Sequence, residues 1–228
     1  MGIVLKRRDN ANIVKKVYGG CLDIIMNEHD VKKSVVFLKN SIEDLIAGRY
    51  PLEDLVITKS LKADYKDPDK IAHKVLAERM GERDPGNKPQ VNDRIPFAYV
   101  QHAGGGAGAK KVLQGDRIEH PDYIKKMNLK LDYEFYITNQ ISTPVCQLYA
   151  LALDQLPGYK RLPGYWGDME KKLVKDKDGD VKKAKEKLAD LKENEAKALL
   201  FDPILLRLKN IKLGNQDITR WFKPVVKD

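Results

Sequence analysis

Three consecutive basic residues, Lys6, Arg7 and Arg8, stand directly before Asp9 and Asn10 near the start of the sequence. The residues that follow have the apolar spacing of a helix, with Asp9 or Asn10 as a suitable N-cap. Cationic side chains and the free N–H groups of a helix N-terminus can converge on one phosphate group. The segment is therefore a candidate phosphate-binding site, and the alternative is a solvated basic cluster.

Two other segments partly resemble known ligand-binding motifs but lack residues that those motifs require. The glycine-rich run Gly104–Gly108 lacks the Gly-Lys-Ser/Thr ending of a phosphate-binding loop, so we interpret it as a linker or hairpin tip. Asp176, Asp178 and Asp180 begin like a calcium loop, but the required Gly and terminal Glu are missing. We interpret this segment as a helix-capping turn. The four histidines are scattered, so no metal site is predicted.

Composition limits the class of protein more than it defines a partner. The net charge is +9, but 18 basic and 12 acidic side chains in residues 155–228 account for +6 of it, so local patterning matters more than total charge. No apolar run approaches the ~20 residues that span a bilayer, and no secretory signal is recognisable. Cys21 and Cys146 lie in apolar stretches and are predicted core residues. We expect a cytosolic or nuclear protein without a membrane partner.

Apolar periodicity predicts several helices in the first 156 residues. The first covers about 11–28, although Gly19 and Gly20 interrupt it. A second is capped by Asp30 and ends before Gly48, and a third starts at Asp67 and Pro68 and stops at Gly81. Asp132 and Pro144 open two more patterns, 133–141 and 145–156.

Short extended segments and one long charged helix complete the predicted elements. Leu55–Ile57 and Ile95–Val100 read as strands, which makes the class α+β and mainly helical, with a small hairpin or sheet. After a hinge at 157–164, a Lys- and Glu-rich stretch predicts a charged helix over about 181–200. The main boundary is placed near residue 157.

Four strings occur in the order and spacing found in one enzyme family. They are MGIVLKRRDNANIVKKVYGG, DLVITKSL, AHKVLAERMGERDPGNKPQVNDRIPFAYV and DYEFYITNQISTPV. Together they resemble the thumb region of family B DNA polymerases of the delta type and of large DNA viruses, and the segment Lys197–Leu205 favours the viral branch. Asn92 replaces the usual glycine of a Gly-Asp-Arg turn, a change that keeps the turn because Asn tolerates positive φ.

The resemblance implies a surface that grips primer–template duplex DNA through its backbone. The residues that match DNA-facing positions are Lys6, Arg7, Arg8, Asn10, Lys59, His73, Arg79, Arg83 and Arg94. Such contacts carry no base information and make affinity depend on salt. His73 has apolar neighbours and is alternatively a buried histidine with a satisfied ring.

The resemblance also implies what this sequence lacks. The palm motif with paired aspartates that hold two metal ions does not occur, so no catalytic residue and no cofactor are predicted on this chain, and the complete enzyme is expected to use Mg²⁺. Its partners would be the duplex, the rest of the polymerase catalytic subunit and a sliding clamp. Its location would be the nucleus or a cytoplasmic viral replication site.

The last segment, Asn215–Phe222, resembles the sliding-clamp binding box. Its expected contacts are a polar first residue, an aliphatic fourth and two aromatics, namely Asn215, Ile218, Trp221 and Phe222. Exposed aromatics in a polar tail are hard to explain as core. The alternative is that the tail packs back on the thumb.

These features predict four regions: 1–10 as the end of a palm-like segment, 11–156 as the thumb, 157–213 as a charged helical extension and 214–228 as the clamp-binding tail. The favoured hypothesis is the thumb portion of a DNA-directed DNA polymerase. The rival hypothesis is a stand-alone, non-catalytic accessory subunit of a split polymerase. A structural helical domain without a nucleic-acid role is the third.

Overall fold

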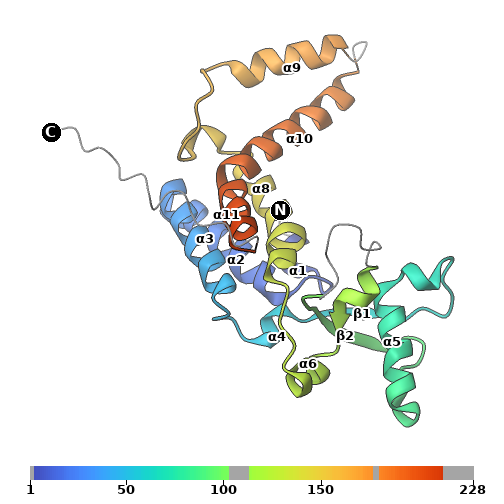
Figure 1. Ribbon diagram of the computed structural model, residues 1–228. Coiled ribbons are helices and arrows are strands. Elements are labelled where there is room, and N and C mark those ends of the chain that lie inside the picture. The colour runs from blue at the N-terminus through green and yellow to red at the C-terminus, as the bar shows by residue number, and fades with distance from the viewer. Residues whose placement is uncertain (1–2, 103–112, 177–179, 213–228) are drawn as a thin grey trace.

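The computed structural model describes residues 3–102, 113–176 and 180–212. The model is mainly helical, with a three-stranded antiparallel sheet of order β1-β2-β3 near one end (Figure 1). This confirms the predicted α+β, mainly helical class. The hairpin tip predicted at Gly104–Gly108 and the tail from Asn215 lie outside the described residues.

A four-residue helix, α1 (Ile3–Lys6), precedes α2 (Asn12–Asp23), which continues as a π-helical turn, Ile24–Glu28. The predicted helix over 11–28 is thereby confirmed, but the predicted cap is wrong. Ala11 occupies the N-cap position without a side-chain bond, because the Asp9 carboxylate instead accepts hydrogen bonds from Arg7 and Lys59.

Helix α3 (Val31–Ile46) packs along α2 and follows the predicted signals at both ends. The Asp30 side chain accepts from the Lys33 backbone N–H, and Gly48 has a φ of 71° just beyond the helix. Gly20 of α2 has a packing reason: an added Cβ would lie 2.3 Å from Cζ of Phe37 on α3. The glycine therefore lets the two helices approach closely.

The sheet consists of β1 (Ile57–Ser60), β2 (Arg94–Tyr99) and β3 (Ile118–Glu119). The second predicted strand is confirmed, whereas the first is shifted, because Leu55 ends the short helix α4 (Leu52–Leu55). Asn92 has a φ of 74°, as the turn before β2 requires. The antiparallel register places Arg94 opposite Ser60, and this pairing positions the basic residues described below.

Helix α5 (Ala72–Arg83) differs from the predicted third helix at both ends. Asp67 and Pro68 begin only a 3-10 turn, Pro68–Lys70, and the helix runs past Gly81. An added Cβ at Gly81 would lie 2.7 Å from Cγ of Lys88, so this glycine makes room for a side chain rather than ending the helix. Helix α6 (Pro121–Met127) follows β3 and has no counterpart among the predicted elements.

A continuous helical run formed by α7 (Tyr133–Phe135), a π-helical segment (Tyr136–Ile141) and α8 (Ser142–Tyr149) passes through the core. Asp132 caps its start, as predicted. Pro144 lies inside this continuous run, just after the π-helical segment, so it does not separate two helices. The predicted helix over 145–156 ends early, and only a 3-10 turn, Leu153–Gln155, follows.

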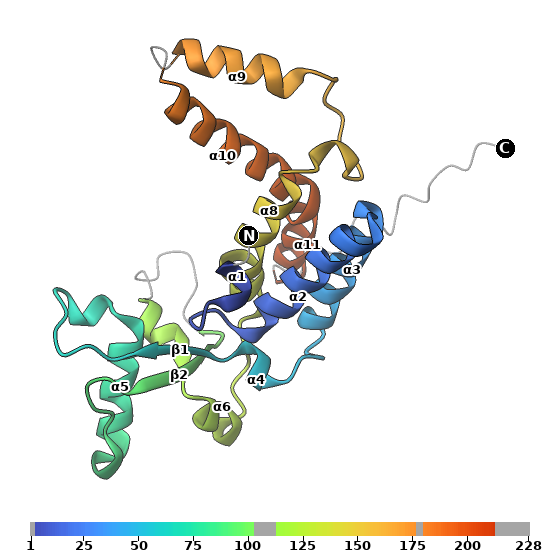
Figure 2. The same cartoon turned by 180° about the vertical axis from the view of Figure 1, so that it is seen from behind.

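The C-terminal part contains α9 (Tyr165–Asp176), α10 (Val181–Leu200) and α11 (Asp202–Lys212). The predicted charged helix and its Asp180 cap are confirmed, while α9 and α11 were not predicted. Leu173, Ala184 and Leu188 form a small core between α9 and α10. This helical hairpin lies at the opposite end of the molecule from β1, β2 and α5 (Figures 1 and 2).

The main core draws on both halves of the sequence. It joins α2, α3 and α8 with the sheet and with Phe201, which is fully buried. Cys21 and Cys146 are buried, as predicted, and burial raises the pKa of each thiol, to about 11 for Cys21. The Tyr136 hydroxyl accepts from the Tyr99 N–H and donates to the Leu55 carbonyl, which ties the sheet to α4.

Candidate nucleic-acid interface

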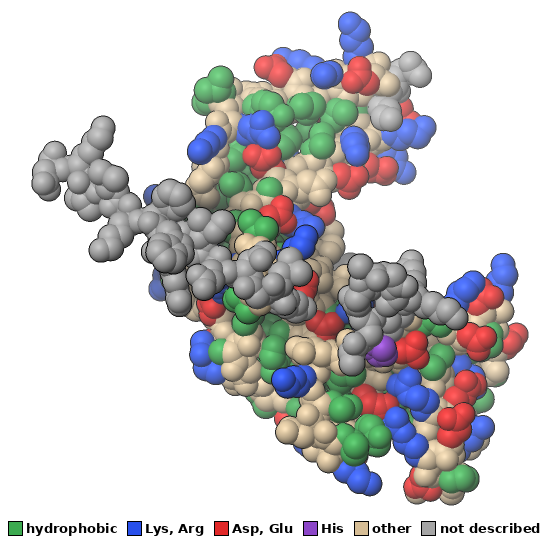
Figure 3. Space-filling view, in the orientation of Figure 1, with side chains coloured by type: hydrophobic (Ala, Val, Ile, Leu, Met, Phe, Trp, Pro, Cys, Tyr) green, Lys and Arg blue, Asp and Glu red, His purple; other side chains and the backbone are tan. Residues whose placement is uncertain are grey.

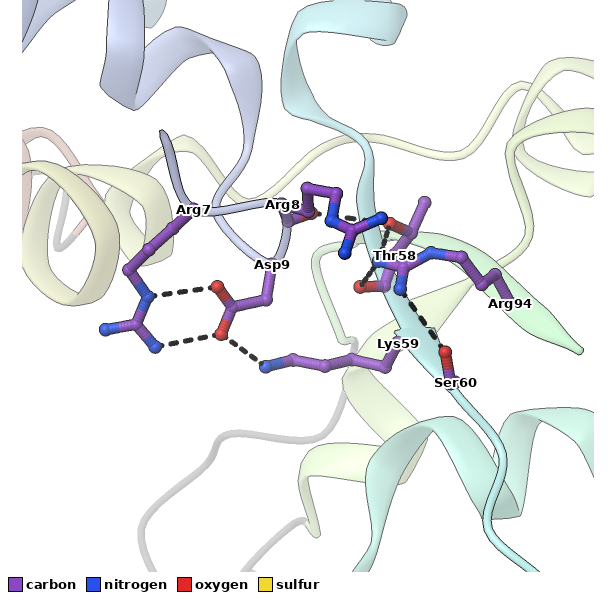
Figure 4. Close-up of polar contacts among 7 residues, drawn as sticks. All are labelled: Arg7, Arg8, Asp9, Thr58, Lys59, Ser60 and Arg94. Atoms are coloured by element: carbon purple, nitrogen blue, oxygen red, sulfur yellow. Dashed lines mark hydrogen bonds and ion pairs between the residues drawn. The ribbon is translucent and has the colours of Figure 1, made fainter. Parts of the chain in front are cut away.

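The basic segment between α1 and α2 lies against strand β1, about 50 residues further along the chain. The Thr58 hydroxyl donates to the backbone oxygen of Arg8 at 3.5 Å, and the Lys59 ammonium lies 3.0 Å from the Asp9 carboxylate (Figure 4). The connection between α1 and α2 is thus held beside the sheet. The fold brings the predicted phosphate-binding segment and Lys59 together.

Asp9 is the acidic centre of this group. Its carboxylate accepts two hydrogen bonds from Arg7, at 3.0 and 2.9 Å, in addition to the contact with Lys59. The Arg7 hydrogen bonds, with a further contribution from Lys59, hold the pKa of Asp9 well below its usual range. Asp9 is therefore ionised at neutral pH and fixes the positions of two cations.

Arg94 on β2 completes the group from the neighbouring strand. Its guanidinium donates to the Thr58 carbonyl at 3.1 Å, to the Thr58 hydroxyl at 2.7 Å and to the Ser60 hydroxyl at 3.3 Å. Figure 4 shows the side chains of Arg8 and Arg94 over the same stretch of β1. We call the group of the exposed Arg7, Arg8 and Arg94 with the half-buried Lys59 the basic edge.

Two other predicted residues lie next to Arg7 and Arg8 along the chain. Lys6 is exposed at the end of α1, and Asn10 is half-buried just before α2. Both lie beside the basic edge because they are neighbours of its residues in the sequence. Neither placement needs the tertiary structure.

His73, near the start of α5, is half-buried and has a hydrogen-bond partner for its ring. Its Nε2 lies 3.1 Å from the Tyr65 hydroxyl. Burial lowers the pKa of His73, and the charges of Lys59 and Lys62 lower it further. The imidazole is thus predominantly neutral at physiological pH.

Arg79, which is half-buried, and Arg83, which is exposed, both contact the buried Glu119 carboxylate. Arg79 donates to the carbonyls of Gly115 and Ile118 and to the carboxylate of Glu119, while Arg83 bonds the same carboxylate at 2.9 Å. Glu119 is only 4% exposed. This cluster connects α5 to β3, so both guanidinium groups carry structural contacts.

Sequence reasoning missed the anionic partners in both clusters. Asp9 was interpreted only as a helix cap, and Glu119 was not singled out at all. The four-residue spacing of Arg79 and Arg83 places both on one face of α5, which indicates a shared acceptor, but it does not identify the carboxylate.

Within residues 3–102, 113–176 and 180–212, no helix has the length and apolar character to cross a membrane, and no group of His, Cys, Asp and Glu side chains forms a metal site.

Comparison with known proteins identifies the family. The family model described as DNA polymerase family B matches residues 1–151, which include the basic edge and the whole sheet. The chain belongs to DNA polymerase family B. This confirms the resemblance drawn from the four strings.

Relatives of this family B chain come from viruses and from cellular organisms. It is 52% identical to a DNA polymerase of Pyramimonas orientalis virus over 222 residues, 97% of this chain and 18% of the relative. It is 52% identical to a DNA polymerase of Acanthamoeba polyphaga mimivirus over 154 residues, 68% of this chain and 9% of the relative. The chain thus spans less than a fifth of the length of either.

A cellular relative covers a similar stretch. The DNA polymerase delta catalytic subunit of Caenorhabditis elegans is 36% identical over 149 residues, 65% of this chain and 13% of the relative. Only the alignment with the Pyramimonas orientalis virus protein, among these three, extends over nearly all of the chain. Helices α9 to α11 lie beyond the residues that the family model matches.

Proposed function

We propose that this chain forms the thumb of a family B DNA polymerase and holds primer–template duplex DNA during DNA replication. The basic edge carries the proposal. Its four cations come from three chain segments, which the fold brings side by side (Figure 4). Asp9 offsets one of these charges, so the edge is a net cationic surface suited to phosphates.

The chemistry of these side chains suits backbone contacts. Arginine pairs with phosphate oxygens through two parallel N–H groups, and lysine acts as a point charge. Neither group reads the base sequence when it binds phosphate. We therefore propose that Lys6, Arg7, Arg8, Lys59 and Arg94 contact the sugar–phosphate backbone, as a polymerase that must accept any sequence requires.

We propose different roles for the other residues predicted to contact DNA. His73 and Asn10 border the basic edge and are proposed as secondary contacts. Arg79 and Arg83 are proposed to support the DNA-binding surface through Glu119, because both pair with this buried carboxylate. We place no catalytic residue on this chain. The complete polymerase is proposed to bind Mg²⁺ through palm aspartates, which makes the rest of the catalytic subunit a partner.

Duplex binding at two salt concentrations tests this proposal. Replacing Lys6, Arg7, Arg8 and Lys59 with alanine should weaken binding equally on unrelated sequences and lower the salt slope by about 0.9 for each phosphate that is no longer neutralised. A matched control replaces four exposed hairpin lysines, Lys172, Lys175, Lys185 and Lys187. Equal weakening in the two variants would show that only total charge matters and would refute the basic edge.

We also propose that the segment Asn215–Phe222 tethers the polymerase to a sliding clamp. Its polar, aliphatic and aromatic residues have the spacing of a clamp-binding box, and the segment lies outside the described residues. A peptide of residues 210–228 should bind the cognate clamp, and replacing Trp221 and Phe222 with alanine should abolish binding while leaving duplex binding unchanged. The absence of both a heat signal and competition with a known clamp peptide would overturn the tether and favour a tail packed on the thumb.

The rival proposal is a stand-alone accessory subunit of a split polymerase. It predicts the same duplex binding, so DNA affinity does not separate the two. A palm-bearing reading frame continuous with this one in the transcript would favour the thumb of a single polypeptide. A separate promoter and stop codon would favour the accessory subunit.

A further inference from the structure

A pocket of about 520 Å³ lies where the segment from Ala150 to Gly167 meets α10. Most of this segment and all of α10 lie beyond residues 1–151, the part that the family model matches. The segments that line it lie toward the α9–α10 end of the molecule, away from β1 and β2 (Figures 1 and 2). Its residues therefore take no part in the duplex contacts proposed above.

Three aromatic side chains form one side of this pocket and hold one another in place. The Trp166 indole N–H donates to the Tyr159 hydroxyl at 2.9 Å, and the Tyr165 ring stands edge-on to Trp166 at a centroid distance of 5.0 Å. Trp166 packs against both the main core and the core of the hairpin. The rings are thus positioned before any ligand arrives, which reduces the ordering cost of binding.

Cations accompany these rings. The Arg161 guanidinium lies 4.8 Å from the centre of the Tyr165 ring and is held by two hydrogen bonds to Glu195. The Lys192 ammonium lies 5.7 Å from the centre of the Trp166 ring, and Lys160 is exposed beside Arg161. Positive charge therefore lies beside an aromatic surface, although Glu195 pairs with Arg161 and Asp154 also lines the pocket.

The rim of the pocket leaves apolar surface uncovered. Leu151 and Leu162, which both line it, are 68% and 79% exposed. Figure 3 shows further hydrophobic side chains gathered between α9 and α10, with charged side chains around them. Exposed apolar groups beside rings and cations are typical of a binding surface rather than of a solvated loop.

An unpaired nucleotide matches this combination better than a duplex does. Base faces in a duplex are stacked on their neighbours, whereas a single strand can place a base on an aromatic ring and its phosphates near arginine or lysine. The volume lies within the ~300–1,000 Å³ range of small-ligand pockets. A purely aliphatic peptide would bring no anionic group to Lys160 and Lys192.

We propose that this aromatic pocket, defined by Tyr159, Arg161, Tyr165, Trp166 and Lys192, binds single-stranded DNA. One base stacks on the exposed part of the Tyr165 ring, beside the edge of Trp166, and the adjoining phosphates lie near Arg161, Lys160 and Lys192. The inference rests on the proposed function, because a polymerase handles unpaired template next to the duplex. It adds a second DNA site, which recognises a different form of DNA.

Tryptophan fluorescence tests the site directly. The chain has two tryptophans, so Trp221→Phe leaves Trp166 as the only one, and this variant serves as the background for every measurement. A ten-residue thymidine oligonucleotide should quench Trp166 saturably. Tyr165→Ala should weaken binding about tenfold, consistent with the 1–3 kcal/mol range for one base–aromatic stack, whereas Tyr165→Phe should retain it. Tyr123→Ala, which removes another half-buried tyrosine under an arginine, should leave quenching unchanged.

Two comparison ligands decide between outcomes. An abasic oligonucleotide of equal length should bind more weakly, and equal affinity would overturn base stacking. A duplex of equal length should quench little, and equal quenching would overturn the preference for single strands. Absence of quenching by the thymidine oligonucleotide up to about 1 mM would refute the site. Anisotropy of labelled duplex with the same protein reports the basic edge separately, so failure of one site is distinguishable from failure of the other.

Discussion

Replacing Asp9 with asparagine should strengthen duplex binding by this chain. Asp9 is the only acidic residue drawn among the basic residues of Figure 4, and it bonds both Arg7 and Lys59. Its charge therefore opposes the approach of phosphates to two cations. Asparagine has nearly the same shape, so the backbone between α1 and α2 should keep its path beside β1.

The size of the effect follows from distance. A phosphate that bonds Arg7 or Lys59 would lie about 6 Å from the Asp9 carboxylate, where repulsion near a hydrated surface is on the order of 1 kcal/mol after screening by salt. This corresponds to about fivefold tighter binding. The salt slope should steepen by up to about 0.9, because one more cation becomes free to release a counterion.

Fluorescence anisotropy with a labelled primer–template at about 50 and 200 mM salt measures both quantities. Asp168→Asn is the matched control, since Asp168 is exposed, pairs with Lys171 and lies on the hairpin at the other end of the molecule. An Asp9→Asn affinity equal to that of the control would show that phosphates do not approach this group. Weaker binding would show that Asp9 is needed to orient Arg7 and Lys59, and would refute the electrostatic reasoning.

Three further outcomes concern stability. Glu119→Ala should lower the free energy of unfolding by about 3 kcal/mol in urea titrations, because it leaves Arg79 and Arg83 without their buried partner. The control Glu53→Ala, at the exposed pair with Lys125, should change this free energy little. Equal decreases in the two variants would contradict the cluster's role. The Gly20→Ala variant should be at least about 1 kcal/mol less stable than Gly19→Ala, because the added Cβ at position 20 would overlap the Phe37 ring. The added Cβ at position 19 would lie 3.4 Å from Leu5, which is an ordinary contact. The reverse order of stability would refute the packing argument. Because the pKa of Asp9 is lowered in the folded chain, its carboxylate stabilises the fold fully above about pH 4, and this stabilisation is lost as pH falls. The unsubstituted chain should therefore lose more stability than Asp9→Asn between about pH 5 and pH 2. Parallel decreases in the two proteins would argue against these ion pairs.

Elements with short-range signals were predictable from the sequence. Asp30 and Asp180 cap the helices that follow them through hydrogen bonds only three residues away, and Gly48 and Asn92 supply positive φ where the chain turns. Such interactions depend on neighbouring residues alone. Helix α10 was therefore predicted with its correct limits.

Elements whose limits depend on packing were predicted less well. Gly81 looked like a helix end because glycine often occupies that position, yet it lies inside α5 to accommodate Lys88. Leu55 looked like part of a strand because its neighbours are apolar, yet it ends α4 in the core. A short apolar run fits a helix or a strand, and the choice depends on residues distant in sequence.

The family, the fold class and the cationic segment Lys6–Arg8 could be read from the sequence, because ordered motifs and adjacent charges are properties of the chain itself. Only the tertiary structure showed which cations share a surface. Antiparallel pairing of β1 with β2 sets Arg94 beside Thr58 and Ser60, and Asp9 links Lys59 of β1 to Arg7. The same folding directs Arg79 and Arg83 to Glu119, some 40 residues away, because a buried carboxylate requires cationic partners and the sequence does not specify which cations lie within its reach.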